Sequence, residues 1–94
     1  MTYYNISVPE LPFEFLQYCE SNNYALSIKK KQIIAHILKL TADADIDTLL
    51  RNIRTDEIKL SQSSIYLVLQ WLIVHGFVIK TTNNFNQVVY KPVN

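Results

Sequence analysis

The 94-residue sequence is poor in residues that interrupt or cross-link a chain, with one glycine, three prolines and one cysteine. The lone Cys19 excludes an intramolecular disulfide and is typical of a reducing compartment. So few glycines and prolines argue against long flexible linkers, and the sequence contains no repeat or low-complexity segment. No basic start leads into an apolar run, so we expect no signal peptide. These absences predict a soluble, cytoplasmic protein with a single domain over residues 1–94.

Charged residues are missing from the most apolar part of the chain. Residues 60–79 contain no Lys, Arg, Asp or Glu, although three serines, two glutamines and a histidine make the stretch too polar for a membrane span. The net charge of +1 conceals an uneven distribution. Residues 25–39 carry four lysines and no acid, whereas residues 1–24 carry three glutamates and no base. This asymmetry predicts a modest directional field over the surface.

The spacing of apolar residues predicts four helices, covering about residues 12–20, 29–39, 46–53 and 61–75. Either Asp45 or Asp47 is expected to cap the third helix. The fourth helix has a clear start and stop, because Ser61 suits an N-cap and Gly76 suits a left-handed residue after the last turn. This last helix also contains the uncharged stretch. Its exposed face therefore has no cation of its own with which to bind a ligand.

A hairpin is expected after the helices, with strands over residues 77–82 and 87–91. Asn83 and Asn84 are suited to the turn between them, and Pro92 is expected to end the second strand. The expected organisation is an N-terminal arm and helix over 1–24, a helical core over 25–76 and a wing over 77–91. This order predicts an α+β, mainly helical fold: a winged helix-turn-helix with an extra N-terminal helix and a C-terminal β-hairpin wing.

Residues 60–78, LSQSSIYLVLQWLIVHGFV, resemble the reading helix of the ferric uptake regulator family, whose pattern is I-S-x-A-T-V-Y-R-x-L followed by L-x-x-x-G-L-V. The stretch LSIKKKQIIAHIL is similar to the first core helix of that family. The resemblance covers roughly residues 25–91 and implies a winged helix, duplex DNA as the partner, and transcriptional regulation. The matching residues are Leu60, Ser61, Ser63, Ser64, Ile65, Tyr66, Leu69, Leu72, Gly76, Phe77 and Val78.

The sequence departs from the family pattern in three ways. Leu67 stands where the family has an arginine, and the helix around residues 46–53 is one or two residues shorter than usual. The wing is expected to end close to Asn94, and we expect the family's second domain, with its His and Cys-x-x-Cys metal ligands, to be absent. The resemblance therefore does not imply metal sensing, and regulation is expected to come through abundance, dimerisation or a partner.

Polar and cationic residues of the second helix, the fourth helix and the wing are the candidates for DNA contact. They are Lys29, Lys30, Lys31, Ser61, Ser63, Ser64, Tyr66, Gln70, Lys80, Asn83, Asn84 and Lys91. Tyr66 is expected to stand outward, flanked by Lys29–Lys31, and to touch a phosphate or a thymine methyl. An alternative stays open for each group: the serines can serve only as caps, Tyr66 can merely cover the core, and the lysines can be solvated.

A second apolar stripe on the fourth helix consists of Leu67, Trp71 and Val74. A helix that is apolar on two sides is usually covered on two sides. The cover is expected to be either the N-terminal helix or a second copy of the chain, which would make a homodimer. The stripe also supports an alternative function, a winged helix for protein–protein interaction or dimerisation that has lost DNA binding, or a structural component of a larger assembly.

The sequence offers no arrangement for catalysis, so we expect no enzyme, cofactor, metal or small-molecule substrate. His36 and His75 lack the paired spacing of a metal site. Cys19 is expected to pack as a small hydrophobic residue. The alternating Asp43, Asp45 and Asp47 lack the glycine and terminal glutamate of a calcium loop.

Overall fold

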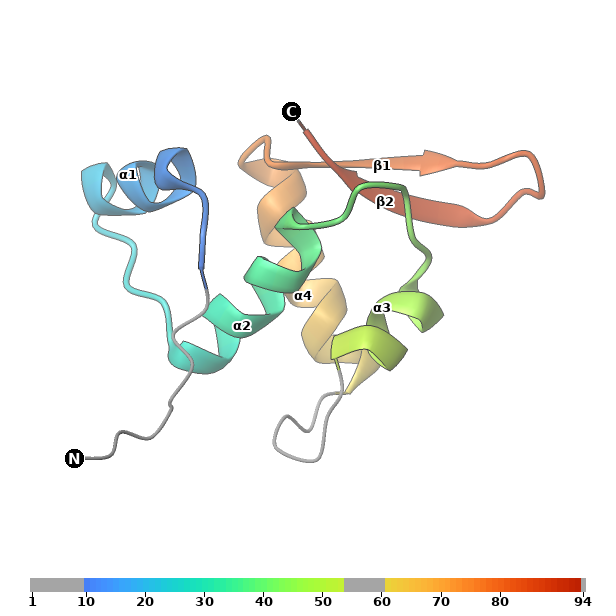
Figure 1. Ribbon diagram of the computed structural model, residues 1–94, viewed down its shortest axis with the longest axis horizontal. Coiled ribbons are helices and arrows are strands. Elements are labelled where there is room, and N and C mark those ends of the chain that lie inside the picture. Colours follow the sequence, from blue (N-terminus) through green and yellow to red (C-terminus); the bar gives the residue numbers. More distant parts are fainter. Residues whose placement is uncertain (1–9, 54–60, 94) are drawn as a thin grey trace.

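The computed structural model describes residues 10–53 and 61–93. Within these ranges four helices precede an antiparallel hairpin, as the sequence predicts (Figure 1). The elements are α1 (Phe13–Ser21), α2 (Ile28–Leu38), α3 (Ile46–Ile53), α4 (Gln62–Val74), β1 (Val78–Thr82) and β2 (Val88–Pro92). The expected arm over residues 1–9 lies outside the described residues. None of the four described helices has the length and apolar character that spanning a bilayer requires.

Side-chain caps fix where three of the helices begin. Asp45 is the residue that caps α3, since its Oδ1 accepts the backbone N–H of Thr48 at 2.8 Å. Ser61 caps α4 as expected. The start of α2 lies one residue earlier than predicted, because Ser27 accepts the N–H of Lys30 at 3.2 Å. Ser27 is not among the caps expected from the sequence, although its hydroxyl precedes an apolar run in the usual way.

Helix α4 ends in a Schellman motif, with the backbone of Gly76 in the left-handed region at φ +81°. The N–H of Gly76 donates to the carbonyl of Ile73 at 3.1 Å, and the N–H of Phe77 donates to that of Leu72 at 2.8 Å. The glycine therefore ends the helix as predicted. It also turns the chain directly into β1, which fixes the hairpin against the C-terminal end of α4.

The register of the hairpin places Lys80 opposite Tyr90 and Ile79 opposite Lys91. The sequence predicts that Pro92 follows the last residue of the second strand. In the structure Pro92 is itself the last paired residue of β2, opposite Val78. Its position at the strand end is compatible with its missing N–H. Beyond the two strands, Ala44 and Tyr90 exchange backbone hydrogen bonds of 3.0 and 2.8 Å. This bridge, absent from the sequence expectations, ties the segment before α3 to the wing.

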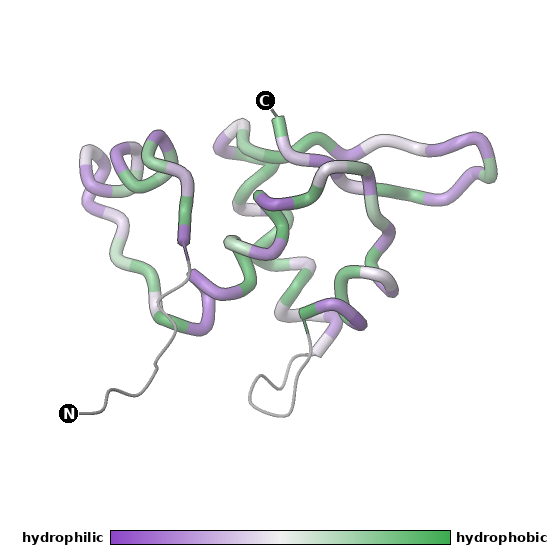
Figure 2. Tube along the Cα trace, viewed as in Figure 1, coloured by the Kyte–Doolittle hydropathy of each residue, from purple (hydrophilic) through white to green (hydrophobic). Residues whose placement is uncertain are grey.

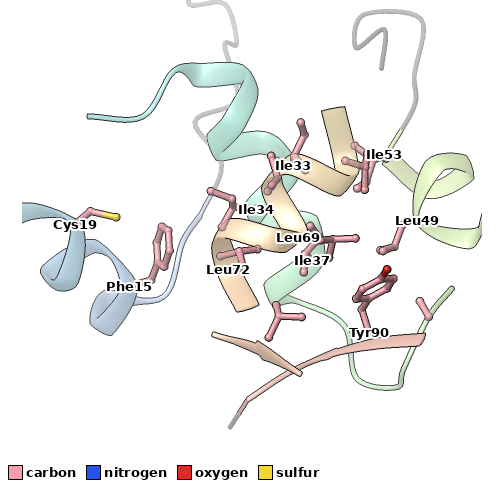
Figure 3. Close-up of a cluster of buried hydrophobic side chains, with 14 residues drawn as sticks. Phe15, Cys19, Ile33, Ile34, Ile37, Leu49, Ile53, Leu69, Leu72 and Tyr90 are labelled. Atoms are coloured by element: carbon pink, nitrogen blue, oxygen red, sulfur yellow. The ribbon is translucent and has the colours of Figure 1, made fainter. Parts of the chain in front are cut away.

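The core lies between α2, α3 and α4, with the hairpin across it (Figure 3). The side chains that are almost fully buried are Phe15, Ile33, Ile34, Ile37, Leu49, Ile53, Ile65, Leu69 and Leu72. Helix α1 adds Phe15 and Cys19 from one side, and β2 adds Tyr90 from the other. Cys19 is buried, as expected for a small hydrophobic residue. Packing against α2 and α3 thus holds α4 in place, with its remaining face turned outward.

Candidate nucleic-acid interface

The outward face of α4 carries no charge and has an apolar centre. Its exposed residues are Gln62, Ser63, Tyr66, Leu67, Gln70 and Val74. Leu67 is 73% exposed and Tyr66 is 45% exposed. Tyr66 therefore stands outward, as the sequence predicts. The face offers hydroxyl, amide and apolar groups, which suit base edges, but any phosphate contact by a cation must come from elsewhere.

The three serines at the start of α4 have different surroundings. Ser61 accepts the N–H of Ser64 at 3.2 Å, and the two hydroxyl oxygens lie 3.0 Å apart. Capping therefore engages Ser61 and Ser64. Ser63 is exposed and lies in a groove with Tyr66, Gln70 and Lys80. Of the three, Ser63 is the serine best placed to meet a ligand across this face.

One flank of α4 is bordered by the start of α2. Lys29 and Lys30 line a groove of about 400 Å³ together with Ser64, Leu67 and Trp71. Both ammonium groups belong to exposed residues. This flank supplies the positive charge that α4 itself lacks.

Lys31 lies on a different side of α2 from that groove. It is only half-exposed, and its charge acts on the Cys19 thiol of α1. Burial raises the pKa of Cys19, and the nearby Lys31 ammonium partly offsets that rise. The three consecutive lysines are therefore divided, because a helix rotates by about 100° per residue.

The other flank of α4 is bordered by the wing. A groove of about 460 Å³ contains Tyr66, Gln70 and Lys80, with Tyr90 at its base. Burial raises the pKa of the Tyr90 hydroxyl, and the nearby Tyr66 hydroxyl adds to that rise. The sequence predicts Tyr66 beside Lys29–Lys31, but the cation that shares its groove is Lys80. The reason is that the lysine groove and the Tyr66 groove lie on opposite sides of Leu67, which borders both.

Acidic residues border the Tyr66 groove toward α3. Asp45 and Asp47 line a space of about 370 Å³ with Tyr66, Lys80 and Gln87. Hydrogen bonds from the side chain and backbone of Thr48 lower the pKa of the Asp45 carboxyl, which therefore stays ionised at neutral pH. Negative charge at this edge disfavours a phosphate there. A polyanion is better accommodated along α4, between α2 and β1.

The wing candidates are not all on the same surface. Residues that face each other across a hairpin share one side of it, and side chains alternate along each strand. Lys80 therefore shares a side with its partner Tyr90, whereas Lys91 pairs with Ile79 on the opposite side. Asn83 uses its side chain within the turn, accepting the N–H groups of Phe85 and Gln87. Asn84 is exposed at the tip.

The second apolar stripe of α4 is only partly covered. Trp71 packs against Phe15 of α1, with ring centroids 6.1 Å apart, and against Tyr24 and His75 at 5.5 and 4.2 Å. Tyr18 holds this cluster together, since its hydroxyl lies 2.6 Å from Nδ1 of His75. The N-terminal helix thus covers Trp71, one of the two covers that the sequence left open. Leu67 and Val74 remain exposed, at 73% and 69%.

Two residues of this region have no signal in the sequence. Tyr24 was not expected to cover Trp71, and Asp47 was not expected beside Tyr66. Both residues lie outside α4 and reach its side chains only through the fold. The spacing of residues within α4 therefore cannot predict them. Among residues 10–53 and 61–93, no group of three His, Cys, Asp or Glu side chains is arranged to hold a metal ion.

The described fold is similar to solved bacterial regulators. The structure of PerR from Streptococcus pyogenes, described as a basis for peroxide sensing and gene regulation, matches with a TM-score of 0.73 and 19% identity over 84% of this chain and 54% of that chain. The ferric uptake regulator of Helicobacter pylori matches with a TM-score of 0.66 and 15% identity over 84% and 53%. The regulator of Vibrio cholerae, whose DNA-binding domains rearrange, gives 0.66 and 12% over 83% and 60%.

No protein-family model matches the sequence, and no curated protein matches it. The chain spans about half the length of the regulators that it resembles. At identities below 20% the similarity concerns the fold. The described chain therefore has the winged helix-turn-helix fold found in ferric uptake regulators, which confirms the fold that the sequence predicts.

Proposed function

We propose that this chain binds duplex DNA and regulates transcription, with the outward face of α4 in the major groove. The observation that carries the proposal is the arrangement of charge around that face. The uncharged surface of Tyr66 and Leu67 is bordered by Lys29 and Lys30 on one side and by Lys80 on the other. Cations on both sides of an uncharged reading surface match the two phosphate strands that border a major groove.

The roles of the individual residues follow from this orientation. Lys29 and Lys30 contact phosphates of one strand, and Lys80 contacts a phosphate of the other. Ser63 and Tyr66 meet the groove first, because they lie in the first turns of α4. Leu67 presses on thymine methyl groups, which are the apolar features of the major groove. Gln70 shares the Tyr66 groove but lies about two turns into α4, so it reaches a base edge only if the helix lies deep in the major groove.

The proposal is tested by mobility shift on a mixed-sequence duplex across a range of salt concentrations. A variant with Lys29→Ala, Lys30→Ala and Lys80→Ala should bind weakly to every sequence. Its slope of log affinity against log salt should fall by roughly three, about one for each lost phosphate contact. Lys39→Ala is the matched control, because Lys39 is an exposed lysine at the opposite end of α2. Failure of the unmodified protein to shift DNA at low salt contradicts the proposal.

Tyr66 tests the reading surface separately from the charge. Tyr66→Ala should weaken binding and change the sequences recovered by selection from a randomised duplex pool, since both ring and hydroxyl are lost. Tyr66→Phe keeps the ring in the groove that it shares with Tyr90, so it should retain the sequence preference if the ring contacts a thymine methyl. If Tyr66→Phe loses as much affinity and sequence preference as Tyr66→Ala, the hydroxyl makes the main contact.

A second candidate function is protein–protein interaction through the same face. The exposure of Leu67 and Val74 on a helix without a cation favours it. The two functions respond oppositely to charge. In a protein interface, an added cation at the apolar centre is desolvated without a partner and weakens association. In a DNA groove, the same cation gains phosphate contacts.

A further inference from the structure

The tip of the wing carries the most exposed large hydrophobic side chain of the described residues. Phe85 is 81% exposed, more than any other large hydrophobic side chain in these ranges. Figure 2 shows a short hydrophobic segment at the end of the hairpin, between hydrophilic ones. Its neighbours Asn84 and Asn86 are polar and exposed. An aromatic ring held so far from the core contributes nothing to its packing, so it is available for an intermolecular contact.

The turn that carries Phe85 is tightly hydrogen-bonded. Oδ1 of Asn83 accepts the N–H of Phe85 at 2.8 Å and that of Gln87 at 3.0 Å, while its Nδ2 donates to Oε1 of Gln87 at 3.0 Å. Two backbone hydrogen bonds add to these, and Asn86 takes a left-handed backbone at φ +60°. The backbone of Phe85 is therefore fixed before any partner arrives. A turn that is already ordered loses little backbone entropy on binding.

The charge of the hairpin favours a polyanion as the partner. Residues 77–93 contain Lys80 and Lys91 and no acid. The asparagines beside Phe85 add amide donors, which suit phosphate and base acceptors. A ring flanked by amide donors on a positively charged hairpin has the composition of the apolar wedges that enter the minor groove of DNA.

The wing is continuous with the reading surface. One space joins Tyr66 of α4 to Lys80, Gln87 and Val88 of the hairpin, and so reaches the base of the tip. Asp45 and Asp47 line the α3 side of this space, so a DNA backbone that follows it would pass on the Lys80 side. Each strand has five residues, so the hairpin extends about 17 Å. In Figure 1 the tip projects beyond the helices. With α4 in the major groove, a projection of this length reaches the neighbouring minor groove.

We propose that Phe85 is a wedge that enters the minor groove beside the major groove occupied by α4 and partly unstacks one base step. Because unstacking costs least at flexible pyrimidine–purine steps, Phe85 gives the protein a preference for such a step under the wing. This inference rests on the proposed DNA binding. It adds a contact and a source of sequence preference that neither α4 nor the lysines supply.

The test uses a duplex recovered by selection from a randomised pool, with 2-aminopurine placed in turn at each adenine. The unmodified protein should raise the fluorescence at one step under the wing, since unstacking relieves quenching. Phe85→Ala should remove that rise and weaken binding roughly tenfold, the scale of losing one base–aromatic contact. Phe85→Leu keeps an apolar wedge and should retain most of the rise. Circular dichroism of each variant checks the fold. The spectra should be unchanged, because the exposed ring of Phe85 does not pack in the core.

The outcomes separate the wedge from DNA binding itself. If the unmodified protein shifts the duplex but raises no fluorescence at any position, the wedge is overturned and DNA binding stands. Binding by Phe85→Ala with unchanged affinity likewise overturns the wedge and leaves DNA binding intact. A sedimentation change from dimer to monomer in Phe85→Ala also overturns the wedge, because a second copy then covers the ring. Absence of any shift by the unmodified protein overturns the proposed function and the wedge together.

Discussion

At the scale of single residues, Leu67 is the residue on which the proposed DNA contact of α4 most depends. It lies between the groove of Lys29 and Lys30 and the groove of Tyr66, and it is 73% exposed. The ferric uptake regulator pattern that the sequence resembles has an arginine at this position. In the proposed complex, a leucine there cannot make a charged contact and instead offers an apolar surface that suits a thymine methyl. The proposed affinity then depends more heavily on the flanking lysines.

Leu67→Arg should therefore tighten DNA binding. A guanidinium at this position gains a phosphate or guanine contact, and about tenfold in affinity is expected at low salt, with a steeper salt dependence. Fluorescence anisotropy of a labelled duplex measures both. Val74→Arg is the matched control, because Val74 is 69% exposed on the same helix but lies two turns further from the first turn. Equal gains from both variants, or a loss from Leu67→Arg, would refute the assigned orientation of α4.

At the scale of elements, the helix ends were the most predictable part of the fold. Ser61 and Gly76 act through neighbouring backbone groups, so local sequence is sufficient to identify them. The same kind of signal limited the cap of α3 to Asp45 or Asp47, and the structure selects Asp45. The positions of the lysines were not predictable in the same way. Whether a lysine borders Tyr66 depends on how α2 crosses α4 and on the hairpin register, and both are set by long-range packing of the core. For the same reason the Ala44–Tyr90 bridge had no local signal.

The cap of α3 makes part of the stability depend on pH. Hydrogen bonds with Thr48 lower the pKa of Asp45 in the folded protein below its unfolded value. The stabilisation that the ionised Asp45 gives to the fold is thus fully present above the unfolded aspartate pKa of about 3.9. It is lost as the pH falls through the lower pKa of the folded protein. Urea denaturation from neutral to acidic pH measures it. Asp45→Asn keeps the acceptor but cannot titrate, so its stability should fall less on acidification; equal falls in both proteins would contradict the role of the cap.

The anchoring of α1 depends on Phe15, which is almost fully buried and packs against Trp71 and Phe77. Phe15→Ala should lower the free energy of unfolding by about 3 kcal/mol, the usual cost of truncating a buried phenylalanine. The emission of Trp71, the single tryptophan, should shift to the red as water reaches its ring. Phe13→Ala is the control, because Phe13 lies on the same helix and is 71% exposed. An unchanged spectrum in Phe15→Ala would show that α1 does not cover Trp71.

At the scale of the whole molecule, charge is distributed around α4 rather than on it. Lysines border the helix from α2 and from β1, and acidic residues lie toward α3. Net charge is only +1, so any attraction to DNA must come from this local arrangement and not from the protein as a whole. The fold fixes the arrangement, because the core between α2, α3 and α4 sets where each lysine lies.

The proposed contact between α4 and DNA is tested most directly by titrating the ¹⁵N-labelled protein with duplex DNA and following its amide signals by nuclear magnetic resonance. Amide shifts should concentrate in the first turns of α4, around Ser63 and Tyr66, and at Lys29, Lys30 and Lys80. Amides on the acidic side, around Asp47, should stay unchanged. Shifts confined to the far side of the hairpin around Lys91, or no shifts at low salt, would contradict the claim that the outward face of α4 meets DNA.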